Sequence, residues 1–204
     1  MRTSSRECDP ADAWRRCPCA LVLPALLALL LSAGNAFSQD NPAPVSPGSG
    51  TVERRRIEPG MGAPGFALKD IAGASFTFAA EKTKSPMLFV FFSIFCESCR
   101  RSLAHAQRLQ DRFGRTGLRV VAVALDGQPF RSSVSGFARQ EGYGFRVLMD
   151  EIEANDRFRA ADLFGVTEIP TSVLIGSGGR ILFVGKGVVP EGDIEKFLTP
   201  AKKP

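Results

Sequence analysis

The sequence predicts a single α/β domain in which a mixed central sheet is flanked by helices. Two continuous apolar runs, residues 87–92 (MLFVFF) and 118–125 (LRVVAVAL), are typical of strands buried on both faces of a sheet. Residues 97–113 between them place apolar side chains at helical spacing, which predicts one right-handed strand–helix–strand unit. Residues 172–175 and 180–184 flank a Gly-Ser-Gly-Gly turn and predict an antiparallel hairpin, so the sheet should be mixed.

The remaining elements of the domain are shorter. Residues 132–140 predict a helix, residues 145–149 a short strand, and residues 154–164 another helix. A last helix over residues 191–198 begins just after Pro190, since proline suits a helix start. With 204 residues in the chain, one domain over residues 61–199 accounts for all of these elements.

The first 36 residues have the pattern of a signal peptide. Four arginines precede an apolar stretch over residues 20–31, which is shorter than the roughly 20 residues of a membrane span. Gly34 and Ala36 provide small residues for cleavage after Ala36. The alternative is an uncleaved leader that tethers the protein to the inner membrane. In either case we expect an exported protein that is soluble in the periplasm or anchored facing it.

Two segments of the chain have the composition of flexible sequence. Residues 37–60 are rich in Pro, Ser and Gly and predict a linker between leader and domain. Residues 200–204 form a short polar tail. The formal net charge of +5, without a long basic run, gives little support for nucleic-acid or membrane binding.

Removal of the leader would leave one pair of cysteines. Three of the five cysteines lie in residues 1–36, so the mature chain would keep only Cys96 and Cys99. These two residues lie where a predicted strand ends and a helix begins. The free amides and the dipole of a helix start stabilise a thiolate on the first cysteine, and the second lies close enough to form a disulfide with it.

Three other uses of the cysteine pair stay open at this point. A purely structural disulfide is possible, although so short a loop constrains the unfolded chain little. A tetrahedral zinc site needs four ligands, and beyond the two cysteines the chain offers a single histidine, His105. Cuprous ion needs fewer ligands and prefers thiolates, so copper handling is a third alternative. We expect no metal and no cofactor other than a redox-active Cys96–Cys99 disulfide.

Residues 62–198 resemble the thioredoxin-like superfamily, and within it the exported TlpA-type thiol-disulfide oxidoreductases with a redoxin domain. Three segments carry the resemblance and occur in family order: GAPGFALKDIAGASFTF (residues 62–78), MLFVFFSIFCESC (residues 87–99) and GVTEIPTSVLIGSGGRILFVGKG (residues 165–187). The resemblance implies a thioredoxin-like fold, with Cys96 as the attacking thiolate and Cys99 as its resolving partner.

Further site residues are implied by the same resemblance. Ile169 and Pro170 would form a cis-proline loop that packs against the disulfide and presents backbone to an extended substrate. Phe95 stands where the family has an aromatic residue, usually Trp, before the first cysteine. Glu97 and Ser98 form the spacer between the cysteines, and Ser98 stands where many members carry proline.

The usual acid–base carboxylates of the family are absent. Val90 occupies the position of a buried aspartate, and Ser102 occupies a position that is often glutamate. Proton transfer to and from Cys99 would therefore use Glu97, Glu168 or water, and the sequence does not choose among them.

The function implied is that of an exported thiol-disulfide oxidoreductase, and specifically a reductase, that exchanges disulfides with periplasmic proteins. Cytochrome c maturation and metalloenzyme assembly are two processes that use such domains. A membrane thiol carrier would supply electrons, and we expect a monomer that binds no nucleic acid. Glu97 disfavours the Cys96 thiolate while Arg100 and Arg101 favour it, which predicts a reducing or middling protein rather than a strong oxidant.

Two alternatives compete with this function. A peroxiredoxin-like peroxidase with antioxidant activity would share the sheet, but the residues before Cys96, FFSIF, lack the proline and threonine with which those enzymes organise peroxide. A non-enzymatic copper-binding or assembly module would space its cysteines by three and add a distant histidine, and the sequence has neither feature.

Overall fold

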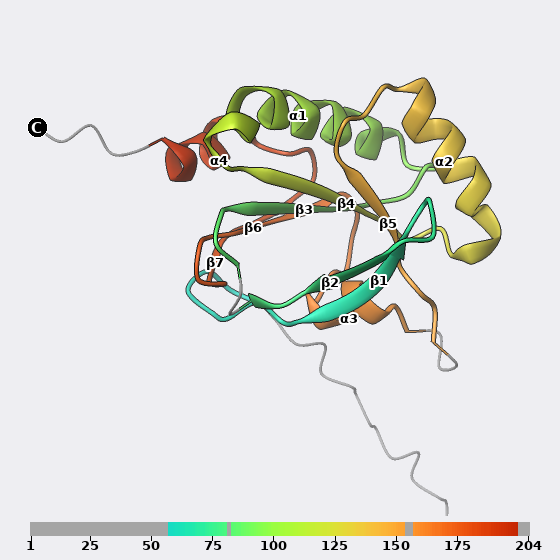
Figure 1. Cartoon of the computed structure of the whole chain (residues 1–204), viewed down its shortest axis with the longest axis horizontal. Helices are drawn as coiled ribbons and strands as arrows, with labels where there is room; N and C mark the ends of the chain where they lie inside the picture. Colours follow the sequence, from blue (N-terminus) through green and yellow to red (C-terminus); the bar gives the residue numbers. More distant parts are fainter. Residues whose placement is uncertain (1–56, 81–82, 154–156, 200–204) are drawn as a thin grey trace, which may run out of the picture. The chain divides into compact units, whose positions relative to one another are not determined.

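The fold is built on one seven-stranded sheet with the strand order β2-β1-β5-β4-β3-β6-β7 (Figure 1). The computed structural model describes residues 57–80, 83–153 and 157–199. β3 pairs in parallel with β4, and β4 with β5, whereas the other neighbouring strands are antiparallel. The strands are β1 (Phe66–Asp70), β2 (Ser75–Phe78), β3 (Met87–Phe92), β4 (Arg119–Ala124), β5 (Arg146–Met149), β6 (Thr171–Ile175) and β7 (Ile181–Lys186).

Helices cover both faces of the sheet. α1 (Glu97–Phe113), α2 (Arg131–Gln140) and α4 (Glu191–Leu198) lie on one face, and the short α3 (Arg159–Leu163) lies on the other. Two 3-10 turns, η3 (Gly114–Thr116) and η4 (Gln128–Phe130), follow α1 and β4. The predicted α/β class with a mixed sheet and flanking helices is confirmed, and β3, α1 and α4 have the predicted bounds.

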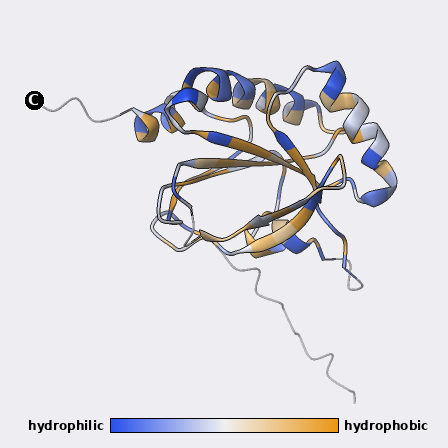
Figure 2. Cartoon of the chain, viewed as in Figure 1, coloured by the Kyte–Doolittle hydropathy of each residue, from blue (hydrophilic) through white to orange (hydrophobic). Residues whose placement is uncertain are grey.

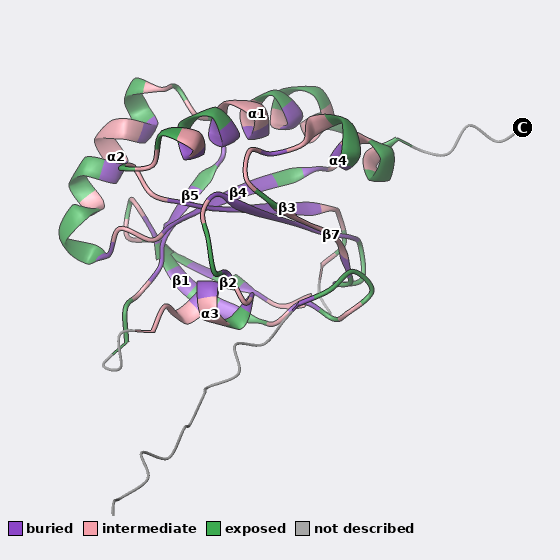
Figure 3. Ribbon diagram, turned by 180° about the vertical axis from the view of Figure 1, so that it is seen from behind, coloured by how far each residue is buried: buried purple, intermediate pink, exposed green. Residues whose placement is uncertain are grey.

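The centre of the sheet is apolar on both sides. All six residues of β3 are buried, and they alternate between two core clusters. Phe89 and Phe91 face the α3 side with Phe164, while Leu88, Val90 and Phe92 face α1. Figure 3 shows this buried centre between the exposed outer sides of the helices. Because both faces are covered, β3 needs an apolar residue at every position.

α1 is amphipathic in the way its sequence predicts. Leu103, Ala106 and Leu109 are fully buried against the sheet, and Figure 2 shows hydrophilic residues on the outer side of the helix. Gln110 contacts the sheet in another way, because its side-chain carbonyl accepts a hydrogen bond of 2.8 Å from the Val120 amide. The helix therefore has a fixed position relative to β4.

The predicted helix over residues 154–164 is too long at its start. Residues 154–156 lie outside the described residues, and the helix begins only at Arg159, because Phe158 still forms an extended bridge with Ile152. The predicted leader and tail, and residues 37–56 of the predicted linker, also lie outside the described residues. Of the linker's last four residues, Ile57 is buried in the core and the Gly60 amide donates a hydrogen bond to the Ile181 carbonyl.

The start of α3 is held by a buried aspartate distant in sequence. Asp150 follows β5, and its carboxylate accepts hydrogen bonds from the amides of Ala160, Ala161 and Glu151 at 2.8–3.2 Å. Burial raises the pKa of Asp150 above its ordinary value although these three amides act in the opposite direction. This carboxylate fixes α3, which leads into the loop before β6.

We expect the Asp150→Ala variant to lose about 2–3 kcal/mol of unfolding free energy, since three amides would lose their acceptor and two of them are buried. Urea denaturation measures this loss. Glu153→Ala is the matched control: the Glu153 carboxylate is exposed and pairs with Arg159 at the surface, so its removal should cost under about 0.5 kcal/mol. Equal losses in the two variants would contradict the role of Asp150.

Candidate active site

Cys96 caps the start of α1. β3 ends at Phe92, and a short loop then leads to Cys96 in extended conformation, with Glu97 as the first helical residue. The Cys96 sulfur accepts a hydrogen bond of 3.2 Å from the Cys99 amide, which is the role that a serine or aspartate oxygen usually has at a helix start. The Ser98 hydroxyl lies 3.3 Å from the same sulfur and can donate to it. Two donors therefore face the position where a Cys96 thiolate would carry its charge.

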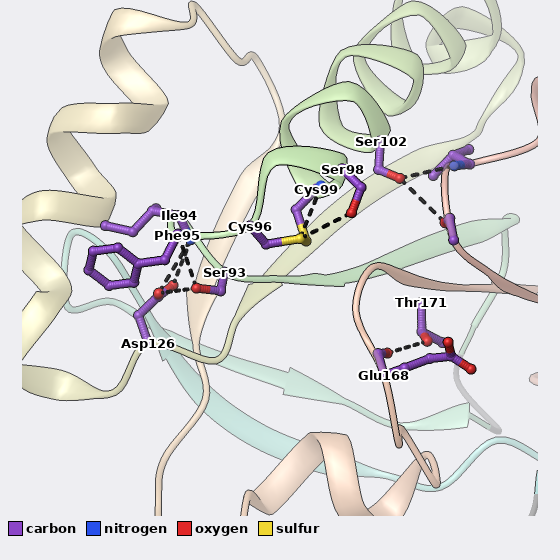
Figure 4. The surroundings of a disulfide bond; sticks show 12 residues. Ser93, Ile94, Phe95, Cys96, Ser98, Cys99, Ser102, Asp126, Glu168 and Thr171 are labelled. Carbon is purple, nitrogen blue, oxygen red and sulfur yellow. Dashed lines mark hydrogen bonds between the residues drawn. A yellow bond between two sulfur atoms is a disulfide. The ribbon is translucent and has the colours of Figure 1, made fainter.

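Cys96 and Cys99 form a disulfide, and the two sulfurs differ in exposure (Figure 4). Cys96 is half-buried, whereas Cys99 is 0% exposed and belongs to the core cluster beneath α1. A protein partner can therefore reach only the Cys96 sulfur directly. This asymmetry is what a mechanism of attack followed by internal resolution requires.

An aspartate at the end of β4 holds the loop before Cys96. The Asp126 carboxylate accepts hydrogen bonds from the Ser93 hydroxyl at 2.6 Å and from the Ile94 amide at 3.3 Å. The Ser93 oxygen in turn accepts one from the Phe95 amide at 3.2 Å. Figure 4 shows this cluster on the side of the loop away from the Cys96 sulfur. Asp126 thus holds the loop that carries Cys96 through two groups, and the bond from Phe95 to Ser93 adds a contact within the loop.

The loop before β6 lies beside the cysteines. Phe91 pairs with Thr171 across β3 and β6, so the preceding Ile169 and Pro170 lie next to the end of β3. The Ile169–Pro170 peptide bond is cis, and the Pro170 carbonyl accepts a hydrogen bond of 2.8 Å from the Gly187 amide. Ile169 is half-buried and packs against both core clusters. The substrate-contacting role of Ile169 and Pro170 stays a prediction.

Ser102 connects α1 to the loop after β7. It is fully buried, its hydroxyl accepts a hydrogen bond of 3.0 Å from the Val189 amide, and it lies 3.5 Å from the Gly187 carbonyl. Its hydroxyl therefore has a structural use at a position where the resembling enzymes often have a carboxylate. Val90, at the other such position, is also fully buried.

The two carboxylates considered for proton transfer lie apart from the disulfide contacts. Glu97 is an exposed residue of the first turn of α1. Glu168 is exposed and its carboxylate pairs with Lys186 at 2.9 Å, while its carbonyl accepts a hydrogen bond from Thr171. The structure brings neither carboxylate into a hydrogen bond with either cysteine among the contacts of the described residues, so their role in proton transfer stays a prediction.

His105 contacts the loop after β7 and the first residue of α4. Its Nδ1 lies 2.9 Å from the Val189 carbonyl and 3.1 Å from the Glu191 carboxylate. Within residues 57–80, 83–153 and 157–199, no three His, Cys, Asp or Glu side chains are grouped so that they could hold a metal ion. The described cysteine pair therefore offers two sulfurs to a metal, without a third ligand of these types.

Comparison with known proteins identifies the family. The model of the redoxin family matches residues 58–199. The chain belongs to the redoxin family. Among curated proteins, it is 27% identical over 149 residues to the thiol-disulfide oxidoreductase ResA of Bacillus subtilis, covering 73% of this chain and 79% of that one. ResA of Halalkalibacterium halodurans is 25% identical over 147 residues, with 72% and 79% covered.

Solved structures of redoxin-like proteins agree with this assignment. A Chlorobium tepidum protein assigned as the thiol:disulfide interchange protein DsbE superposes with a TM-score of 0.59 at 29% identity, covering 69% of this chain and 94% of that one. A thiol:disulfide interchange protein from Bacteroides sp. shares the fold with a TM-score of 0.60 at 19% identity, covering 72% and 94%. Together with the Cys96–Cys99 disulfide, these relatives show a thiol-disulfide oxidoreductase of the thioredoxin-like superfamily.

Sequence reasoning missed Ser93 and Asp126 as site residues. A signal for them was present: Ser93 directly follows β3, Asp126 comes two residues after β4, and these parallel strands are neighbours with Phe92 opposite Ala124. The carboxyl ends of such strands lie together at one edge of the sheet, where α/β proteins place their sites. Asp126 therefore could have been expected beside the loop that carries Cys96.

We expect the two spacer residues to shift the reduction potential in opposite directions. Ser98→Ala removes a donor to the Cys96 sulfur, so the thiolate loses stabilisation and the potential should fall by about 10–30 mV. Glu97→Gln removes a negative charge near Cys96, so the potential should rise. Equilibration with glutathione redox buffers measures both values. A rise in Ser98→Ala would contradict the assigned hydrogen bond.

Proposed function

We propose that this redoxin is an exported disulfide reductase that acts on protein disulfides. The observation that carries the proposal is the asymmetric pair, with an accessible Cys96 sulfur facing two hydrogen-bond donors and a Cys99 sulfur buried behind it. The related ResA proteins are named as thiol-disulfide oxidoreductases, which supports the same chemistry here.

The reaction begins with the reduced dithiol. The Cys96 thiolate attacks one sulfur of a substrate disulfide, forms a mixed disulfide, and releases the other substrate sulfur as a thiolate that takes up a proton. Cys99 then loses its proton and attacks the Cys96 sulfur, which releases the second substrate thiol. Two electrons pass to the substrate, and the enzyme is left with the Cys96–Cys99 disulfide seen in the structure.

The exported location rests on the sequence of residues 1–36 and on the use of cysteines. None of the helices formed by the described residues could span a membrane. An oxidising compartment supplies protein disulfides as substrates, and a membrane thiol carrier would return electrons to the oxidised enzyme. The substrates of the enzyme would be periplasmic proteins, such as those of cytochrome c maturation or metalloenzyme assembly.

We expect the Cys96→Ser variant to lose insulin-disulfide reduction at least about 100-fold, because the remaining cysteine of the pair, Cys99, is buried out of reach of the substrate. Cys99→Ser is the matched control. It should still form the mixed disulfide at a rate comparable to the native protein, but it should not resolve it, so the covalent complex accumulates on non-reducing gels. Retention of insulin reduction in Cys96→Ser would contradict the proposed function. A Cys99→Ala variant added to an extract of periplasmic proteins would trap its substrates as mixed disulfides, and the trapped proteins could then be identified.

A further inference from the structure

Three exposed apolar side chains gather beside the active site. In the part of the chain that the structure describes, five large apolar side chains are exposed: Phe95, Phe130, Ile152, Leu163 and Phe197. Phe95, Phe130 and Ile152 are 72%, 42% and 53% exposed, and the first two rings touch edge to face with centroids 5.3 Å apart. We call Phe95, Phe130 and Ile152 the Phe130 patch. Apolar side chains gathered on a surface in this way mark an interaction site more often than scattered ones do.

A hollow lies beside two residues of the patch, Phe130 and Ile152. The hollow is lined by the loop from Asp126 to Phe130, by Glu151 and by Ile152. Gly127 has a φ of +75°, and a Cβ added there would lie 3.4 Å from Ile152 Cδ1 and 3.7 Å from Pro129 Cδ. Ile152 and Pro129 therefore pack over Gly127, which joins Ile152 to the loop that carries Phe130.

The patch has a fixed position relative to the reactive sulfur. Phe95 directly precedes Cys96, and Phe130 lies four residues after Asp126. Since Asp126 holds Ser93 and Ile94, both halves of the patch belong to one hydrogen-bonded unit. In Figure 4 the Phe95 ring lies on the side of the loop away from the Cys96 sulfur. A segment bound to that sulfur would have to continue past Phe95 to cover the patch.

The two carboxylates that line the hollow already have hydrogen-bond or ion-pair partners. Asp126 accepts the hydrogen bonds of Ser93 and Ile94, and Glu151 pairs with Arg159 at 2.8 Å. Both carboxylates that line the hollow therefore have partners within the protein, and the side chains of the Phe130 patch itself are apolar.

We propose that the Phe130 patch is a docking surface for protein substrates that carry an apolar side chain close to the attacked cysteine. This inference rests on the proposed function, because the substrate's sulfur must reach Cys96. An extended chain advances about 3.3 Å per residue, so a leucine or aromatic residue about two to four positions from the cysteine can reach the patch. Its burial there adds binding that does not depend on the sulfur, which would distinguish substrates of equal disulfide reactivity.

The test uses two peptides that differ only at those positions, with leucine in one and serine in the other. For binding, serine replaces the peptide cysteine, and fluorescence anisotropy measures affinity for the Cys96→Ser/Cys99→Ser protein. We expect the leucine peptide to bind about 5–20 times more tightly. Phe130→Ser/Ile152→Ser in the same background should abolish the difference. Phe130→Ser alone should reduce the difference in affinity between the two peptides. This single variant replaces the double variant in the test if thermal unfolding shows that the double change affects folding.

Phe197→Ser is the matched control. Phe197 is 46% exposed but lies on α4, which pairs through Glu195 with Arg112 in the last turn of α1, the end distant from Cys96. This variant should keep the preference for leucine. Equal affinities for the two peptides, or an unchanged preference after Phe130→Ser/Ile152→Ser, would overturn the docking surface. Sedimentation could also show that the native protein is a dimer and that Phe130→Ser/Ile152→Ser dissociates it. That result would overturn the docking surface too, because the patch would then bind a second copy of the chain.

Reduction of the same peptides, carrying cysteine as a glutathione mixed disulfide, separates this inference from the proposed function. At low peptide concentration, the native reduced protein should reduce the leucine peptide about 5–20 times faster than the serine peptide. Bis(2-hydroxyethyl) disulfide is too small to reach the patch, so it should react at equal rates with the native protein and the patch variants. Leucine-selective binding without reduction of any disulfide would support the docking surface and refute the proposed function. Reduction of both peptides at equal rates would support the proposed function and refute the docking surface.

Discussion

The burial of β3 on both faces is the constraint on which the active site depends. Because each of its six residues must be apolar, β3 can lie only at the centre of the sheet, with β4 on one side and β6 on the other. Its carboxyl end then delivers Cys96 to the start of α1. β4 brings Asp126 to that end, and β6 brings Ile169 and Pro170. The site is thus assembled from three neighbouring strands, and none of its parts could be moved without changing the sheet.

The chemistry follows from the different surroundings of the two sulfurs at this position. Cys96 lies where a helix start supplies an amide donor and where Ser98 supplies a hydroxyl, while Cys99 is enclosed by the core under α1. The two positions for which the family resemblance implies a carboxylate hold Val90 and Ser102, and both are buried. The Ser102 hydroxyl joins α1 to the loop after β7 through the Val189 amide.

Local patterns were enough to predict the elements that carry the cysteines, but not the contacts that hold them. The apolar run of β3, the periodicity of α1 and the glycine turn before β7 each depend on a few neighbouring residues, and they predicted the mixed sheet. The Asp126 cluster and the capping of α3 by Asp150 join residues 10 to 33 positions apart. Such contacts depend on strand order, which composition and periodicity do not fix. The extended bridge between Ile152 and Phe158 likewise shortened a helix that local pattern had predicted.

The most direct test of the assigned roles is the relative alkylation rate of the two cysteines in the reduced protein. Iodoacetamide at neutral pH, followed by peptide mapping at short times, reports which sulfur is an accessible thiolate. The structure predicts that Cys96 is modified at least about 100 times faster than Cys99, because thiolate character and exposure control the rate. Modification of Cys99 at an equal or higher rate would contradict the assignment of Cys96 as the attacking residue.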